Sequence, residues 1–291
     1  MHPAPSVIIF TVLTGLGFGL FFLLGLGIPK VVGINAFYYY FIAYLLSVGG
    51  LIASTFHLGN PKNAYKSFSQ WKTSWLSREG WLAVATLLLF AIVAIASIFF
   101  ETHLPILACF SAGIALLTIF STSMIYAQLK TIPRWNHYLV PIYFLALSTA
   151  GGTLLAGQSS IASVLLILTL LLQIALWVIG DRQFAEKGST METATGLGRI
   201  GKVRLFEPPH TGNNYLLNEM VYVVGRKHAH KIRMLTVLFL SLIPCVILLL
   251  LPAGILTTTI ATIFHLIGAF MSRWLFFAQA EHVVGLYYGK R

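Results

Sequence analysis

The chain has 291 residues, of which 57% are hydrophobic and 9% are charged, and its formal net charge is +11. A soluble domain usually has about 25% charged residues, so this composition and a mean hydropathy of +0.84 exclude a soluble globular protein and indicate several membrane crossings. Basic residues collect in the cytoplasmic loops of such proteins, so the positive charge does not indicate nucleic-acid binding.

Eight apolar segments have the length of about 20 residues that a transmembrane helix needs. They lie at about 6–28, 37–56, 80–99, 104–128, 137–157, 160–180, 234–251 and 254–275. The first is longer than the apolar core of a secretory signal, so we interpret it as a retained span. Its GxxxG pair, Gly15 and Gly19, is expected to pack helices within the chain, with dimerisation as the alternative. The sequence predicts an all-α fold, one bundle of eight transmembrane helices within a single domain, 1–291.

The distribution of basic residues predicts the orientation of the chain. With eight spans both termini lie on one side, and the loops and ends on that side hold all of the 19 Lys and Arg residues except Lys30 and Arg273. Because basic residues gather in cytoplasmic loops, we expect both termini on the cytoplasmic side of the inner (plasma) membrane.

Two connecting segments are long enough to form structure outside the membrane, 57–79 and 181–233. In the second, residues 213–230 combine asparagines at the start with spaced apolar and basic side chains, which predicts a short amphipathic helix. This helix would lie on the membrane surface or serve as a docking surface for a cytoplasmic partner. The same loop contains GLGRIG at 196–201, which we interpret as a chance match to the dinucleotide-binding pattern because no strand is predicted before it.

His57 and Glu79 are predicted at the same membrane face, where the second span ends and the third begins, counted at a helical rise of about 1.5 Å per residue. An imidazole can hydrogen-bond a quinone carbonyl and changes protonation near neutral pH. A carboxylate can relay the protons that accompany two-electron transfer. His57 and Glu79 therefore form a candidate quinone site, with Arg78 as a further candidate. The alternative is that they are polar residues that flank helices at the interface.

The last predicted span contains two more ionisable candidates, His265 and Arg273. His265 lies about halfway across, where polar residues are costly and often functional; a neutral histidine satisfied by a neighbouring helix is the alternative. Arg273 lies near the cytoplasmic boundary, and we expect its side chain to extend to the interface. A haem between two histidines is poorly supported, because no second histidine is predicted at the depth of His265.

The two cysteines cannot supply the four ligands of an iron–sulfur cluster, and we predict no metal site in the chain. Any such cluster is therefore expected on another subunit.

The residues at 57–79 resemble those of the membrane-anchor subunits of dimethyl sulfoxide reductases. Those anchors have eight spans, with an HLG-x-P segment ending the second and an S-x-L-S-x-E segment opening the third. This chain has HLGNP at 57–61 and SWLSRE at 74–79, and its hydropathy pattern agrees throughout. The resemblance implies that His57 and Glu79 belong to a quinone site and that the anchor lacks haem. It also implies two partners, a molybdopterin catalytic subunit and an iron–sulfur subunit, which hold those cofactors.

Within this family the chain looks most like the anchors of cytoplasm-facing sulfite-oxidising molybdoenzymes. The similar segments are the start MHPAPSVIIFT, the loop segment GRIGKVRLFEPPHTGNNYLLNEM and the end RWLFFAQAEHVVGLYYG. The resemblance implies that electrons from sulfite reduce the quinone, with S-oxide reduction by quinol as the alternative. Two other classes stay open: a haem-bearing cytochrome subunit, and a transporter, which would place its substrate near the midplane and often show repeat symmetry.

Overall fold

The computed structural model describes residues 1–289 apart from 57–59, 208–209, 211, 213 and 222–227. These residues form helices and connecting segments, with no strand among them. The long helices are α1 Pro5–Gly25, α2 Gly33–Thr55, α3 Trp75–Phe99, α4 Pro105–Ala127, α5 Leu139–Leu155, α6 Ser159–Glu186 and α11 Ile255–Ala278. The segments α9 Ala229–Val237, η4 Leu238–Leu242 and α10 Ile243–Leu250 form one continuous stretch. The short segments are η1 Pro61–Phe68, α7 Met191–Thr195, η2 Leu197–Arg199, η3 Leu216–Met220 and η5 Val283–Tyr288.

The all-α, multi-pass prediction is confirmed, and within the described residues seven helical stretches are long and apolar enough to cross a membrane. The predicted fifth span, 137–157, corresponds to α5, which has only 17 residues. It is about 25 Å long, less than the roughly 30 Å of a hydrocarbon core. Most of its residues are buried, because α5 packs against α1, α4, α6 and α11. Neighbouring helices rather than lipid therefore surround much of α5.

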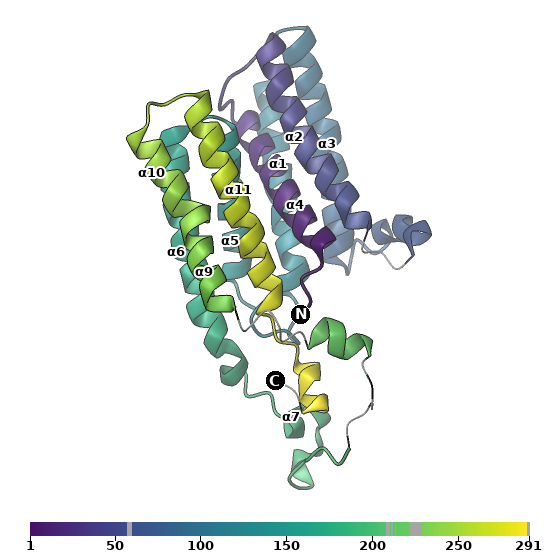
Figure 1. Cartoon of the computed structure of the whole chain (residues 1–291). Helices are drawn as coiled ribbons and strands as arrows, with labels where there is room; N and C mark the ends of the chain where they lie inside the picture. The colour runs from purple at the N-terminus through teal and green to yellow at the C-terminus, as the bar shows by residue number, and fades with distance from the viewer. Residues whose placement is uncertain (57–59, 208–209, 211, 213, 222–227, 290–291) are drawn as a thin grey trace.

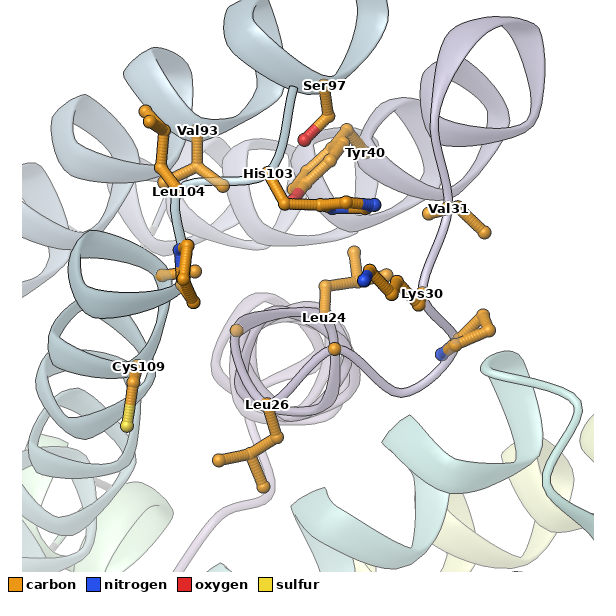
Figure 2. A pocket seen from close by; sticks show the side chains of 15 residues that line it. Leu24, Leu26, Lys30, Val31, Tyr40, Val93, Ser97, His103, Leu104 and Cys109 are labelled. Carbon is orange, nitrogen blue, oxygen red and sulfur yellow. The ribbon is translucent and has the colours of Figure 1, made fainter. Parts of the chain in front are cut away.

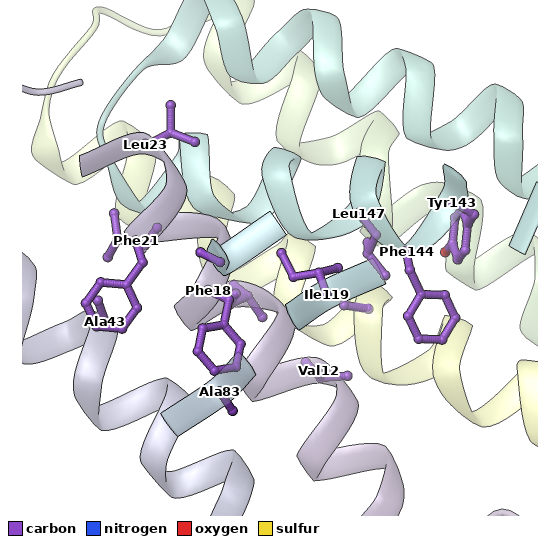
Figure 3. Close-up of a cluster of buried hydrophobic side chains, with 14 of the residues drawn as sticks. Val12, Phe18, Phe21, Leu23, Ala43, Ala83, Ile119, Tyr143, Phe144 and Leu147 are labelled. Carbon is purple, nitrogen blue, oxygen red and sulfur yellow. The ribbon is translucent and has the colours of Figure 1, made fainter. Parts of the chain in front are cut away.

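Helix α1 lies at the centre of the bundle, between α2 and α3 on one side and α6 and α10 on the other (Figure 1). It packs directly against α2, α4, α5 and α11. Figure 3 shows the apolar core that results, in which Val12 and Phe18 of α1 lie near Ile119 of α4 and Leu147 of α5. The burial of these side chains fixes the relative positions of the helices that hold the polar groups described below.

The backbones of α1 and α5 approach closely at Gly19 and Gly152. A Cβ atom on Gly19 would stand 1.9 Å from the carbonyl oxygen of Ser148, and one on Gly152 would stand 2.4 Å from the backbone of Gly19. Side chains larger than hydrogen would force the two helices apart. Packing within the chain, predicted for the GxxxG pair, is confirmed at Gly19.

Both termini lie at the same end of the bundle, beside α7, η3 and η5 (Figure 1). The N-terminal amine donates a hydrogen bond of 2.6 Å to the carbonyl oxygen of Ala280, just beyond α11. The backbone N–H of Val283 donates to the carbonyl oxygen of Thr131 in the α4–α5 connection. These bonds hold the start and the end of the chain against the same group of loops.

Two predictions concern the long loop at this end. Of the amphipathic helix predicted at 213–230, the described part contains η3, and the backbone leaves the helical conformation at Val221. Residues 222–227 lie outside the described residues, so a single helix there stays a prediction. Gly196 ends α7 in the left-handed conformation with φ 70°. GLGRIG therefore follows a helix instead of a strand, which confirms that it is a chance match.

Candidate functional site

Glu79 lies inside α3, whereas the sequence predicted it just before the span. The helix begins earlier than predicted, at Trp75, because Ser74 already takes the extended conformation of an N-cap residue. Glu79 is 4% exposed, so its carboxyl group is buried against neighbouring helices. This correction changes what the group can contact.

The hydroxyl of Thr122 on α4 donates a hydrogen bond to Oε1 of Glu79. The same hydroxyl lies 3.1 Å from the carbonyl oxygen of Thr118. A hydroxyl has one proton to donate and two lone pairs. It can donate to an ionised Glu79, or accept from a protonated Glu79 while it donates to Thr118. This arrangement therefore accommodates both protonation states of the carboxyl group.

An open cleft of about 650 Å³ lies on the outer side of α3 and α4, at the end of these helices where Glu79 is found. We call it the tryptophan cleft, and its lining residues are Trp71, Trp75, Arg78, Trp81, Leu82, Leu117, Phe120 and Ser121. Its volume falls within the range of small-molecule sites, and such sites combine apolar walls with a few polar groups. The tryptophan cleft therefore suits a flat, largely apolar ligand.

Arg78 and Trp81 hold the walls of the tryptophan cleft in place. The guanidinium of Arg78 donates to the carbonyl oxygens of Trp71 and Lys72, at 2.9 and 2.7 Å. It also lies 4.3 Å from the centre of the Trp75 ring, in cation–π geometry. The indole N–H of Trp81 donates to the carbonyl oxygen of Phe68 in η1, at 3.0 Å. The 69–74 segment and η1 are thereby attached to the first turns of α3.

The carboxyl group of Glu79 and the tryptophan cleft lie on two sides of one wall. Ser121 of α4 lines the cleft, and the next residue, Thr122, binds Glu79. Glu79 itself does not line the cleft, so any proton exchange with a ligand there must cross this wall. His57, the predicted partner of Glu79, lies outside the described residues.

His265 lies in the interior, 0% exposed, with Nδ1 2.8 Å from the carbonyl oxygen of Leu240. Pro244 has no N–H to donate to that carbonyl, and its ring would clash with the carbonyl in a regular α-helix. The π-helical turn η4 occurs at this point. Because a carbonyl only accepts, Nδ1 carries the proton and Nε2 is left as an acceptor. A neighbouring helical stretch therefore supplies the partner of Nδ1, and a functional role of His265 stays a prediction.

The expectation that Arg273 extends to the interface is wrong. Arg273 is 1% exposed, and its guanidinium carbon lies 3.5 Å from the centre of the Phe144 ring on α5. The residue lies on the face of α11 that packs against α1 and α5, so its side chain enters the bundle. Neither His265 nor Arg273 lines the tryptophan cleft.

Sequence reasoning missed a buried polar cluster beside Arg273. The hydroxyls of Tyr143 and Ser272 lie 2.6 Å apart, and each is 2.5 Å from Oε1 of Gln173. These residues come from α5, α11 and α6. Tyrosine, serine and glutamine are common in any helix, so only Gln173 within a long apolar run offered a signal.

A second cavity, of about 400 Å³, lies at the opposite end of α1, α3 and α4 (Figure 2). Lys30 and His103 line it from the α1–α2 and α3–α4 connections, and the hydroxyl-bearing side chains of Tyr40 and Ser97 lie on its wall. Of the predicted site residues that the structure describes, Arg78, Glu79, His265 and Arg273, none lines this cavity.

These features define a multi-pass helical membrane protein with an aromatic cleft on the outer side of the bundle, next to a buried carboxyl group. The chain belongs to the DMSO reductase anchor subunit (DmsC) family, whose model matches residues 1–279. It is 31% identical to the C subunit of sulfite dehydrogenase from Allochromatium vinosum, over 99% of both chains. No solved structure matches it. The resemblance inferred from the sequence is confirmed, both for the anchor family and for the likeness to a subunit of a sulfite-oxidising enzyme.

Proposed function

We propose that this chain is the quinone-reactive anchor of a complex with a molybdopterin catalytic subunit and an iron–sulfur subunit. It would pass electrons between the iron–sulfur subunit and quinone in the bilayer. The family supports the anchor role. The observation that carries the quinone site is the tryptophan cleft on the outer side of α3 and α4, which has the buried Glu79–Thr122 pair behind its wall.

Reduction of a quinone to a quinol takes up two electrons and two protons. In the direction we favour, sulfite oxidation on the molybdopterin subunit supplies the electrons, as the likeness to a sulfite dehydrogenase subunit suggests. In this chain the indole rings of Trp71, Trp75 and Trp81 would stack on the quinone ring. Glu79 would exchange protons through Thr122, whose hydroxyl accommodates both states of the acid. His57 would hydrogen-bond a quinone carbonyl.

We further propose that α5 is a span, which makes eight, and that both termini face the cytoplasm from the inner membrane. The short α5 connects α4 and α6, and both termini lie at one end of the bundle. A C-terminal alkaline phosphatase fusion should then be inactive, while the same enzyme inserted after Lys30 should be active. The opposite pattern would reverse the orientation.

The quinone site is tested with the purified complex by following sulfite oxidation with a short-chain quinone or with ferricyanide as acceptor. We expect His57→Ala to abolish quinone-coupled turnover and Glu79→Gln to reduce it and alter its pH dependence. Both variants should keep the ferricyanide activity, because this acceptor takes electrons from the partner subunits. Matched controls are His103→Ala and Glu101→Gln at the opposite end of the bundle. Equal loss with both acceptors would make His57 and Glu79 structural.

The substrate of the complex is tested separately, by comparing sulfite-dependent quinone reduction with quinol-dependent reduction of dimethyl sulfoxide. Activity only with the S-oxide would favour the alternative reductase. A chain that purifies from native membranes without molybdenum, iron and partner subunits would instead favour a transporter, and a haem absorption band would favour a cytochrome subunit.

A further inference from the structure

Arg273 is a buried cation with incomplete hydrogen bonding. Its Nε and Nη1 atoms have no hydrogen-bond partner among the described residues. The Phe144 ring supplies a cation–π contact, but a buried charge without paired hydrogen bonds is costly. A guanidinium in this position therefore needs water or a counter-charge nearby.

A cavity of about 10 Å³ adjoins Arg273 and is also lined by His265, Thr11, Gly15 and Ser148. This volume is about what one water molecule requires, and the site has several polar partners for it. Nε2 of His265 is a further buried atom without a partner among the described residues. A water here would satisfy groups that the helices leave unpaired.

A second cavity of about 10 Å³ continues from the first toward Glu79. Thr11, Gly15 and Ser148 line both cavities, and Thr122 lines only the second. The hydroxyl of Thr11 lies 3.0 Å from the carbonyl oxygen of Val7, to which it donates, so its lone pairs are free to accept from water. Polar groups thus follow one another from α3 to α11, and we call them the buried polar path: Glu79, Thr122, Thr11, Ser148, His265 and Arg273.

We propose that two buried waters complete this path and that Arg273 is the counter-charge of Glu79, acting through them. The inference rests on the proposed role of Glu79 at the quinone site, which it deepens by adding a positioning residue. It accounts for two features at once, a buried carboxyl group that accepts a hydrogen bond from a hydroxyl, and a buried guanidinium with two nitrogens that no described residue pairs. The pair would make the membrane interior neutral when Glu79 is ionised, and positive by one charge when Glu79 takes a proton.

Other ionisable groups face the path. Tyr126 of α4 packs against the rings of Phe144 and Phe276, with ring centres 5.8 and 5.4 Å away, and the guanidinium of Arg273 lies over the same two rings. Tyr143 of α5 lies beside Arg273, and His265 adjoins the same cavity. Arg273 is the cation among these groups, because His265 carries its proton on Nδ1 and none on Nε2, and is therefore neutral. The charge of Arg273 is therefore the one that favours the ionised form of Glu79.

The test follows the infrared carboxyl band of Glu79 in the purified complex, assigned by its loss in Glu79→Gln, as a function of pH. We expect Arg273→Gln to move the titration of this band upward by about one pH unit, and Arg273→Lys to leave it nearly unchanged because the charge is kept. Thr11→Val and Ser148→Ala should move it in the same direction by less. Thr149→Val is the matched control, because its hydroxyl bonds only to its own helix.

An unchanged titration in Arg273→Gln would overturn the pairing. A shift in Arg273→Gln without any shift in Thr11→Val and Ser148→Ala would overturn the role of the waters. Because this readout needs no quinone, it separates the two proposals. If Glu79→Gln keeps full quinone turnover while the band shifts as expected, the counter-charge stands and the quinone role of Glu79 fails.

Discussion

The two ends of the bundle each have a cavity large enough for a small molecule, about 650 Å³ beside Glu79 and about 400 Å³ at the opposite end. The two cavities differ in the polar groups that lie on or behind the residues lining them. Behind the tryptophan cleft a buried carboxyl group meets a hydroxyl and a path of polar groups. At the opposite end Lys30 and His103 are exposed, and the buried side chain of Tyr40 on the wall is a phenol instead of a carboxyl group. Volume alone does not distinguish the two cavities, and the buried carboxyl group is the feature on which we base the proposal of a quinone site at the tryptophan cleft.

After the loss of turnover expected in His57→Ala, the largest effect is expected in the tryptophan cleft. Replacing Trp75 by leucine removes one aromatic wall and the ring that Arg78 covers, and should raise the KM for quinone about ten-fold. The activity with ferricyanide should stay unchanged. Leu104→Ala in the opposite cavity is the control. A larger KM change in the control than in Trp75→Leu would move the quinone site to the opposite end.

The free energy of unfolding should also depend on an ion-pair cluster at the end of the bundle where Glu79 lies. The Asp181 carboxylate on α6 accepts hydrogen bonds from Arg134 at 2.6 Å and from Arg233 at 2.7 and 2.6 Å, which joins α6, α9 and the α4–α5 connection. Because Asp181 is half-exposed, we expect Asp181→Asn to lower the free energy of unfolding by only about 1–2 kcal/mol. Thermal unfolding in detergent should report a Tm lower by roughly 2–8 °C. Glu101→Gln at the opposite end should leave the Tm unchanged. If it lowered the Tm as much as Asp181→Asn does, the two ends would not differ in their contribution to stability.

A smaller, pH-dependent effect is expected at the termini. Partial burial, and then the nearby N-terminal amine, lower the pKa of His282, and its Nδ1 accepts from the N–H of Val284 at 3.0 Å. The unfolded chain therefore binds a proton that the folded chain resists, so stability falls as the pH drops below the ordinary histidine pKa of about 6.5. Amide hydrogen exchange in η5 should accelerate on acidification, beyond the intrinsic change, and His282→Gln should abolish this. If the η5 amides of the wild type kept the same protection from exchange at acidic pH, the proposed effect of His282 would be contradicted.

The smallest effect is expected at the opposite cavity. Lys30→Gln and His103→Ala should change quinone turnover less than two-fold, an energetic change below about 0.4 kcal/mol. Steady-state kinetics with both acceptors measures this. A loss comparable to that of Trp75→Leu would show that both ends take part in the reaction.

The apolar segments were sufficient to predict the helices, because helix length and hydropathy are read directly from the chain. The residue type of Glu79 and the SWLSRE segment are sufficient to make Glu79 a candidate site residue. They do not predict its burial, because the helix begins earlier than the apolar segment, after the N-cap residue Ser74. Arg273 was misjudged because snorkelling and burial differ only in which face of α11 the residue occupies. That face depends on packing against α1 and α5, which no periodicity in α11 revealed.

The contact between His265 and Leu240 has a consequence for how the chain can vary. Pro244 removes a donor from one helix and His265 returns a donor from another. Losing His265 alone leaves the Leu240 carbonyl without its partner, at a cost of about 1–3 kcal/mol. Losing Pro244 alone gives that carbonyl a competing donor and removes the reason for the π-helical turn. Positions 244 and 265 should therefore change together among related anchors, as a single compensating pair.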